Sequence, residues 1–449
     1  MMNLLAFANL TGTHVAGWRH PKSYTKFVSN LAARIELAQI AERGKLDGIF
    51  IADGNGVNFM EKRRLLEANI PGTTSADFEP VTVLTAISQH TRYLGLVATA
   101  TTTYEPPWVI ARKFGSLDMI SGGRCGWNAV TSAYAGDAFN FGGTPHPPRA
   151  QRYEQAMESI EVVTGLWDSW AEDAFPQNKA TGQYLDSSKV CTLDHKGKYF
   201  QVKGPLSVPR SRQGRPVLFS AGQSEHGKEL AARYSDAVFA TSLTKEIALR
   251  DYADTKGRLA KYGRAPESLR FLPGLVCYIA ETTAQAKEYF EEVQSLLDPE
   301  VGKLFLWRSL GIDLDNYSVD EPMPEVKGEI LGGYSNREHM GEVAKAERYT
   351  IRQTYERMCP GGGTTYIAGT ASEIADLMED WYSSGACDGF VLSGGCVPKD
   401  LTGISDLLIP ELQRRGLFRK DYVGTTLREN MGLSIPVRPD VSSPKRAHS

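Results

Sequence analysis

The feature that most constrains the fold is a repeated alternation of short apolar runs with longer amphipathic stretches. The apolar runs begin near residues 3, 48, 94, 124, 216, 237, 270 and 388. Strands that are apolar throughout belong to a sheet that is buried on both faces. Eight such strands with intervening helices predict a (β/α)8 TIM barrel with loop insertions. The runner-up is a doubly wound open sheet, which would bind its ligand at a strand-order switch that sequence does not reveal.

The chain length is compatible with one barrel. With 449 residues the chain is long for an ordinary domain, but barrels with insertions reach this size. We therefore expect a single domain over residues 1–449. Two segments exceed the minimal repeat: 171–215, where we expect a hairpin and a loop, and 298–370, a polar, Gly-rich stretch expected to form a mobile lid. The Arg-rich segment 417–449 predicts an extended, disordered tail.

Charge and cysteine usage exclude several classes of protein. The chain has 50 basic and 53 acidic residues, which argues against a binder of nucleic acid or of a membrane surface. No apolar run approaches the roughly 20 residues of a membrane helix, and no basic leader precedes the first apolar run, so we expect no signal peptide. The 6 cysteines lack CxxC spacing and the 8 histidines lack metal-ligand spacing. These features predict a reduced, cytoplasmic chain without a metal site.

The sequence lacks the common catalytic motifs. Neither GxxxxGK[ST] nor a GxGxxG that follows a strand and opens a helix is found, and HExxH and GxSxG are missing too. Small hydrogen-bonding residues instead follow the expected strands, where a barrel places its active site. They are Asp53, Thr99 to Thr103, Asn128, Thr131, Ser132, Ser220 to Gly222, Thr241 and Ser242. Such a rim has no obvious nucleophile–base pair and suits a cofactor that supplies its own chemistry.

Asn128 is the most informative of these residues, because it lies inside an apolar run. A buried amide must find hydrogen-bond partners. Asn carries donors and an acceptor, which match the alternating edge of a flavin or nucleobase ring. The alternative is an Asn that bonds the neighbouring backbone inside the barrel, and the residue alone does not decide between the two.

The stretch SGGRCGWNAVTS (121–132) resembles a signature of the bacterial-luciferase-like flavin monooxygenases. It is most similar to the branch that contains nitrilotriacetate monooxygenase component A, dibenzothiophene-sulfone monooxygenase and pristinamycin synthase. Other stretches that carry the resemblance are GWRHP (17–21), FIADG (50–54), HKGKYFQVKGPL (195–206), SAGQSEHG (220–227) and TLRENMGLSIP (426–436). They run in order along almost the whole chain.

The resemblance implies a two-component FMN-dependent monooxygenase with a (β/α)8 barrel. Such an enzyme uses reduced FMN, supplied by a separate NAD(P)H:flavin reductase, and O2 to oxygenate a small organic substrate of the aminopolycarboxylate, thioether or sulfone type. It also implies a homodimer or homotetramer. Two alternatives stay open: a deazaflavin-dependent hydride-transfer oxidoreductase of the same fold, and a non-catalytic flavin-binding relative. The identity of the substrate is not predicted, since substrate choice depends on the insertion loops.

The resemblance also implies a set of cofactor-binding residues. Asp53, Thr99, Asn128 and Tyr153 match family contacts to FMN. Arg149 stands where several members have a histidine, and an arginine can also contact a phosphate. Without the family, Asp53 is interpreted as a turn residue before a glycine and Thr99 as an ordinary strand residue.

Three further expectations concern the phosphate, the substrate and water. Gln223 and Ser224 lie in a turn that opens a helix, whose free N–H groups suit the FMN phosphate. The alternative for Ser224 is an ordinary N-cap. His20 is the candidate catalytic residue near the substrate, because imidazole changes charge near neutral pH; the alternative is a structural hydrogen bond. Four aromatic residues are expected to keep the pocket dry: Trp18, Phe59, Trp127 and Phe239.

Overall fold

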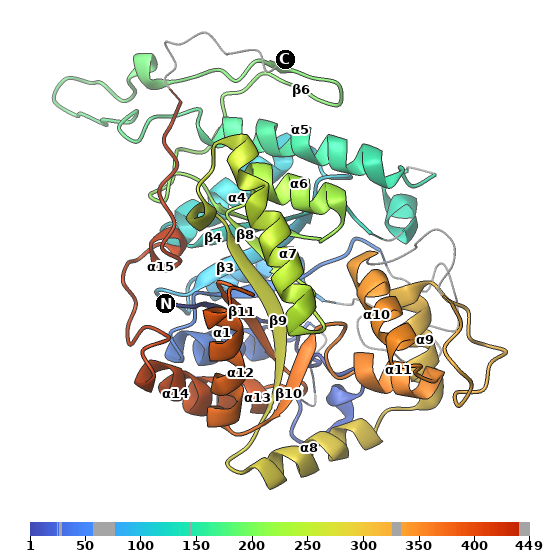
Figure 1. Ribbon diagram of the computed structural model, residues 1–449. Helices are drawn as coiled ribbons and strands as arrows, with labels where there is room; N and C mark the ends of the chain where they lie inside the picture. The colour runs from blue at the N-terminus through green and yellow to red at the C-terminus, as the bar shows by residue number, and fades with distance from the viewer. Residues whose placement is uncertain are drawn as a thin grey trace.

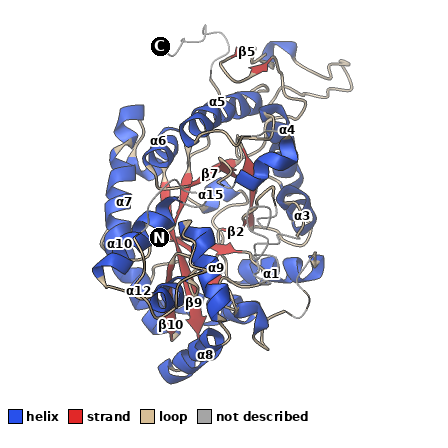
Figure 2. Ribbon diagram, turned by 90° about the vertical axis from the view of Figure 1, so that its right-hand side faces the viewer, coloured by secondary structure: helices blue, strands red, loops and turns tan. Residues whose placement is uncertain are grey.

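The computed structural model describes residues 1–24, 26, 29–56, 77–133, 135–142, 145–325 and 334–439. Eight parallel strands form a closed barrel, which Figure 2 shows from the side that carries α9 and α10. Around the ring they are β1 (Asn3–Phe7), β2 (Gly48–Ile51), β3 (Gly95–Thr101), β4 (Cys125–Val130), β7 (Val217–Ala221), β8 (Ala237–Ala240), β9 (Arg270–Ile279) and β11 (Gly389–Gly394). Because β11 pairs with β1, the ring closes, and the predicted (β/α)8 barrel is confirmed over the open sheet.

Helices surround the barrel (Figure 1). They are α1 (Leu31–Arg43), α3 (Pro80–Ile87), α4 (Pro107–Ser121), α5 (Arg149–Trp167), α6 (Glu225–Tyr234), α7 (Lys245–Gly257), α8 (Thr283–Ser295), α12 (Ala371–Ser383), and α13 (Lys399–Gly403), which continues through a π-turn into α14 (Ile409–Arg414). Local signals set their ends. The Asn30 side chain accepts from the Ala33 N–H to begin α1. Gly122, with a φ of 72°, ends α4 in the left-handed conformation that glycine adopts without strain.

Side chains alternate between the two faces of the strands. Leu5, Phe50, Val97 and Phe219 fill the barrel interior, where they form one buried cluster. The intervening residues, such as Leu96, pack against the helices. This alternation is the period of two that strand geometry imposes on side-chain direction. It decides which polar residues can face a ligand inside the barrel mouth.

The alternation corrects one sequence prediction. Trp127 does not line a pocket, because it packs outward in the cluster between strands and helices. Its indole N–H donates to the Ala100 carbonyl (3.3 Å), and its ring meets Trp167 edge-on at 6.0 Å. Phe239 does face inward and packs on Phe7 and Phe50, with ring centroids 6.0 and 5.7 Å away. Phe59 lies outside the described residues.

The described residues of the segment 298–370 form a cap with its own apolar cluster. The cap comprises α9 (Pro299–Leu310), α10 (Tyr334–Ala346) and α11 (Ile351–Met358), and it leads into β10 (Thr365–Gly369). Its cluster includes Val15 and Leu243, which follow β1 and β8, so the cap sits at the carboxyl ends of the strands. Figure 1 shows these helices on the right of the barrel. That the cap is a mobile lid stays a prediction.

Two shorter elements complete this description. β10 pairs with the second half of β9, along the edge where β8 pairs with the first half. Within 171–215, β5 (His195–Lys196) and β6 (Gln201–Val202) form an antiparallel hairpin. The hairpin docks on α5, since the Glu158 carboxylate accepts from the backbone N–H of Tyr199 (3.0 Å) and of Phe200 (2.8 Å). Short 3₁₀ turns cover Gly17–Arg19, Ala135–Phe141, Ser187–Lys189, Leu259–Tyr262 and Pro266–Ser268.

The end of the chain closes the opposite mouth of the barrel. The prediction of a disordered tail is wrong for residues 417–439, where α15 (Leu427–Asn430) places Leu427 and Met431 in the interior cluster. Gly95 makes room for this plug, because a Cβ there would lie 2.4 Å from Leu427 Cδ1. Arg428 pairs with Asp236 at 2.7 Å, an ion pair that holds the segment against the barrel. Residues 440–449 lie outside the described residues.

Across the described ranges, no helix combines the length and apolarity required to cross a membrane. The same ranges contain no group of three or more His, Cys, Asp or Glu side chains that could hold a metal ion.

Candidate active site

A polar pair lies inside the barrel mouth, above the aromatic layer. Thr99 of β3 and Asn128 of β4 are register partners and both are buried. The Thr99 hydroxyl donates to the Ile51 carbonyl (2.8 Å) and accepts from Asn128 Nδ2 (2.9 Å). Since the single hydroxyl proton goes to Ile51, the Asn128 group that faces Thr99 must be the amide nitrogen.

Within the part of the chain that the structure describes, this orientation leaves Asn128 Oδ1 buried without a hydrogen-bond partner. Asn128 is only 3% exposed. A buried acceptor without a partner costs about 1–3 kcal/mol, so the arrangement indicates a ligand that brings an N–H to this point. The imide N–H on the edge of a flavin ring is a donor of this kind. The neighbouring Thr99 thus fixes how Asn128 is oriented, with its amide nitrogen bonded inside the barrel. That Asn128 Oδ1 accepts from FMN stays a prediction.

A second polar layer lies at the ends of the same two strands. The hydroxyls of Thr101 and Ser132 are 2.8 Å apart, and the Thr103 N–H donates to Thr101 Oγ1 (3.1 Å). Ser132 has a φ of 48°, in the left-handed region that serine adopts at a cost. Arg152 of α5 donates to the Thr131 carbonyl (3.0 Å) and to that of Ser132. Arg152 was not predicted from sequence, because nothing in the α5 pattern marks it as facing the rim.

The turn before α6 forms the second part of the site. Gly222 has a φ of 135°, and a Cβ on Gly227 would lie 2.6 Å from the Gly222 carbonyl oxygen, so the chain turns as tightly as glycine permits. Ser224 caps the helix, with its hydroxyl oxygen accepting from the Gly227 N–H (3.3 Å). The N-cap alternative is thus present, and it uses the oxygen and not the proton of the hydroxyl.

Tyr153 lies beside this turn. Its hydroxyl is 3.0 Å from the position of a Cβ on Gly222, and its ring stacks on His226 with centroids 5.6 Å apart. α6 is ten residues long, and the first N–H groups of such a helix attract an anion. The structure therefore brings Tyr153 and Ser224 together at one turn, and binding of the FMN phosphate there stays a prediction. His226 was missed from sequence, where it was one more histidine without metal spacing.

The Gln223 side chain bonds within the protein. Its oxygen accepts from the Thr241 N–H (2.9 Å) and its amide donates to Asp251 (2.9 Å). Binding of the FMN phosphate by the turn that contains Gln223 stays a prediction.

Asp53 and Arg149 lie on the rim. Asp53 follows β2, and although the residue keeps contact with solvent, its carboxyl group is largely surrounded by protein. Loss of solvent raises the pKa of Asp53 to about 6, and the nearby carboxylates of Glu79, Glu105 and Asp137 add to the shift. Arg149 is the first residue of α5, one helical turn before Tyr153, and it is half-buried. Binding of FMN by Asp53 and Arg149 stays a prediction.

His20 lies elsewhere. Its ring packs edge-on against Tyr289 of α8 (5.3 Å), and its Nε2 is 3.3 Å from the Glu292 carboxylate. Among the described residues, no hydrogen bond or ring contact joins His20 to Thr99 or Asn128. The structure does not bring His20 together with the polar pair, and its catalytic role stays a prediction.

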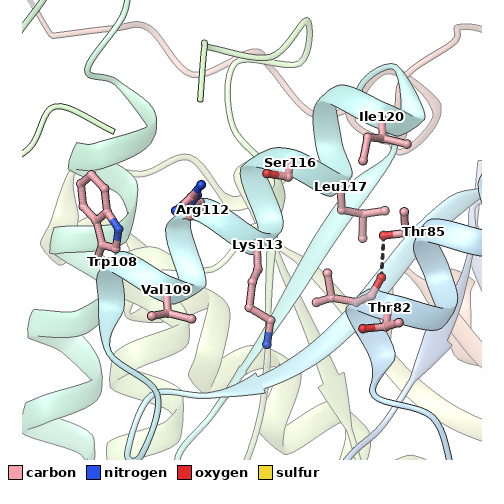
Figure 3. Close-up of a pocket in the computed structure, with 10 residues that line it drawn as sticks. Thr82, Thr85, Trp108, Val109, Arg112, Lys113, Ser116, Leu117 and Ile120 are labelled. Carbon is pink, nitrogen blue, oxygen red and sulfur yellow. Dashed lines mark hydrogen bonds between the residues drawn. The ribbon is translucent and has the colours of Figure 1, made fainter. Parts of the chain in front are cut away.

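A pocket of about 560 Å³ lies on the outer face of α3 and α4, away from the barrel mouth (Figure 3). Trp108, Val109, Leu117 and Ile120 provide its apolar walls, with Lys113 at one edge. It contains none of the predicted site residues.

Comparison with known proteins agrees with this geometry. The family described as luciferase-like monooxygenase matches residues 5–387. The chain is 42% identical over 429 residues to N-acetyl-S-(2-succino)cysteine monooxygenase of Bacillus subtilis, with 95% of each chain covered. It is 42% identical over 439 residues to nitrilotriacetate monooxygenase component A of Aminobacter aminovorans, with 97% of each covered.

A solved structure extends the similarity to a flavin complex. Riboflavin lyase, determined with modified FMN and riboflavin, superposes with a TM-score of 0.85 at 30% identity and covers 97% of this chain and 96% of its own. Both the sequence matches and the superposition span nearly the whole barrel, which confirms the resemblance found in the sequence. The chain belongs to the luciferase-like monooxygenase family.

Proposed function

We propose that this protein is the oxygenase component of a two-component system that uses reduced FMN and O2. The observation that carries the proposal is the buried, unpartnered Oδ1 of Asn128, fixed in place by Thr99. Asn128 Oδ1 is available to accept a hydrogen bond from a ring N–H of FMN. The turn at Ser224 and Tyr153 suits the phosphate of the same molecule. Bound reduced FMN supplies the electrons that activate O2.

The chain's own residues bind and shield that cofactor. Asn128 would accept from the ring edge, and the N–H groups of residues 223–225 would hold the phosphate, together with the hydroxyls of Ser224 and Tyr153. Phe7 and Phe239 are half-buried and pack on the interior cluster below the polar pair, where they exclude water from the barrel. Exclusion of water protects a reactive oxygen species from unproductive decay.

The substrate class follows from the relatives at 42% identity, whose names specify a succinylated cysteine thioether and nitrilotriacetate. Both molecules combine several carboxylates with a central sulfur or nitrogen atom. We propose a substrate of this kind, a small thioether or amine that carries two or more carboxylates. A sulfone is the second candidate, in keeping with the 36% identity to dibenzothiophene-sulfone monooxygenase.

The partner, assembly and location are also proposals. An NAD(P)H:flavin reductase would supply reduced FMN, as the designation "component A" of one relative suggests. We propose a homodimer or homotetramer. All six cysteines are free and five are buried, which suits the reducing cytoplasm.

The direct test is an oxygenation assay with reduced FMN from any flavin reductase. Carboxylated thioethers, aminopolycarboxylates and aryl sulfones are offered under ¹⁸O2, and products are read by mass spectrometry. Incorporation of one ¹⁸O atom per product supports the proposal. The proposed monooxygenase activity would be wrong if no substrate class incorporated oxygen from O2 and the protein instead transferred hydride from a reduced deazaflavin.

A variant tests the phosphate turn. Ser224→Ala is expected to raise the Kd for FMN about 10- to 100-fold, because a hydrogen bond to a charged group contributes about 1.5–3 kcal/mol. Turnover at saturating FMN should change little. Fluorescence titration with FMN measures the effect.

Thr244→Ala provides the matched control. Thr244 caps α7 as Ser224 caps α6, by accepting from the Ile247 N–H (3.4 Å). Thr244→Ala therefore removes a helix cap but no proposed contact to the phosphate. Equal Kd values for wild type and Ser224→Ala would remove Ser224 from the phosphate site.

A further inference from the structure

A chain of hydrogen bonds and ion pairs between buried side chains leads from the turn at residues 222–224 to the cap. Its first member is Gln223, whose side chain is held at both ends, by Thr241 (2.9 Å) and by Asp251 of α7 (2.9 Å). Gln223 is 6% exposed and Asp251 is 1% exposed. Thr241 and Asp251 therefore hold the side chain of Gln223 in place from inside the protein.

Asp251 is the centre of this chain. Its carboxylate lies 3.0 Å from the ammonium of Lys228 on α6, which also pairs with Asp254 at 2.9 Å. On its other side it lies 3.4 Å from Nε2 of His339 on α10. Arg250 is the remaining nearby cation, 3.9 Å away, and it also reaches Glu342 of α10 at 3.5 Å. Asp251 thus joins the turn, α6 and the cap helix through one carboxylate.

His339 completes the chain from the cap side. Its Nδ1 is 3.2 Å from the Thr241 carbonyl, and its Nε2 faces Asp251. The Thr241 carbonyl can only accept, so Nδ1 is the donor in that contact, and Nε2 is the ring atom turned toward the Asp251 carboxylate. Thr241 is the residue that also binds Gln223 through its N–H. His339 therefore contacts the same two residues that clamp the turn.

We propose that Asp251 and His339 are positioning residues that couple the FMN phosphate turn to the docking of α10 in the cap. The inference rests on the proposed function, since it takes the 222–224 turn as the phosphate site. A phosphate that orders this turn holds Gln223 in place, and Gln223 in turn fixes the two acceptors that His339 needs. By linkage, a docked cap then strengthens FMN binding by the same factor as FMN strengthens docking.

The coupling is measured by hydrogen exchange in α10, with saturating FMN or riboflavin as the probes. FMN is expected to slow exchange of the α10 amides in the wild type, and riboflavin, which lacks the phosphate, is expected not to. His339→Ala should abolish the FMN-dependent protection and raise the Kd for FMN at least about 5-fold. Asp251→Asn should act in the same direction, because it keeps the size of the side chain but loses the charge that faces His339 and Lys228.

His195→Ala is the matched control, since His195 also pairs with a carboxylate, Glu158, at 3.1 Å but on the distant hairpin. It should leave the Kd and the protection of α10 unchanged. If His339→Ala does not fold, His339→Gln serves instead, because Gln can keep one of the two contacts but not both.

The outcomes separate the two levels of the proposal. If wild type binds FMN but α10 exchange is the same with and without it, or if His339→Ala keeps both the Kd and the protection, the coupling is wrong and the proposed function stands. If wild type shows no FMN binding and no oxygenation, the proposed function itself fails.

Discussion

Asn128→Leu is expected to abolish oxygenation while leaving the protein at least as stable as wild type. Leucine has nearly the same shape, so the barrel mouth keeps its packing. The variant removes a buried oxygen that has no partner among the described residues, and that removal offsets the loss of the bond to Thr99. A flavin ring without its acceptor would be misplaced, and a misplacement of about 1 Å can lower the rate about 100-fold.

Two measurements check this prediction: the melting temperature, and the yield of oxygenated product per reduced FMN consumed. Asn3→Leu is the control. Asn3 is a buried strand asparagine at the opposite end of the barrel, where its amide bonds Asp47 (3.4 Å). It should lower stability and spare the reaction. A normal product yield from Asn128→Leu would show that Asn128 has only a structural role.

Truncation after residue 416 is expected to prevent folding. The missing segment carries Leu427, which fills the closed mouth of the barrel, and Arg419, whose guanidinium lies 2.6 Å from the buried carboxylate of Asp47. Removing one partner of a buried ion pair costs about 3–5 kcal/mol because a charge is left uncompensated. The truncated chain would therefore appear in inclusion bodies, or as an unfolded species by circular dichroism.

A point variant makes the same test on a folded chain. Leu427→Ala should lower the free energy of unfolding by about 2–5 kcal/mol, as for other fully buried leucines. Val437→Ala, at a side chain that is 88% exposed in the same segment, should leave the free energy unchanged. Denaturant titration compares the free energy of unfolding of wild type, Leu427→Ala and Val437→Ala. A cooperative, wild-type transition from the truncated chain would show that this plug does not stabilise the barrel.

The barrel was predictable from sequence because its strands are apolar on both faces. β3 and β4, for example, are buried along almost their whole length and are mostly apolar, and their predicted positions near 94 and 124 match Gly95–Thr101 and Cys125–Val130. Glycines and caps then set the helix ends. The cap was not predicted as helices, because α10 and α11 each contribute only a few apolar residues, from an otherwise polar stretch, to a cluster that they share with α9. The segment 417–439 was misjudged because its buried apolar side chains, such as Leu427 and Met431, are few and lie between polar and charged residues in the sequence.

Local periodicity and contiguous motifs are enough to predict the (β/α)8 barrel, the family, and the Asn128 and Ser224 stretches of the candidate site from the amino-acid sequence. The contacts of each side chain are visible only in the folded chain. Trp127 packs on the outer face of the barrel, His20 contacts Tyr289 of α8, and the Gln223 side chain bonds Asp251. Sequence patterns do not reveal these contacts, because a hydrogen bond or a packing contact needs two groups close in space and here the two groups come from distant segments of the chain. Asp251 and His339 are 88 residues apart in sequence, yet 3.4 Å apart in the fold.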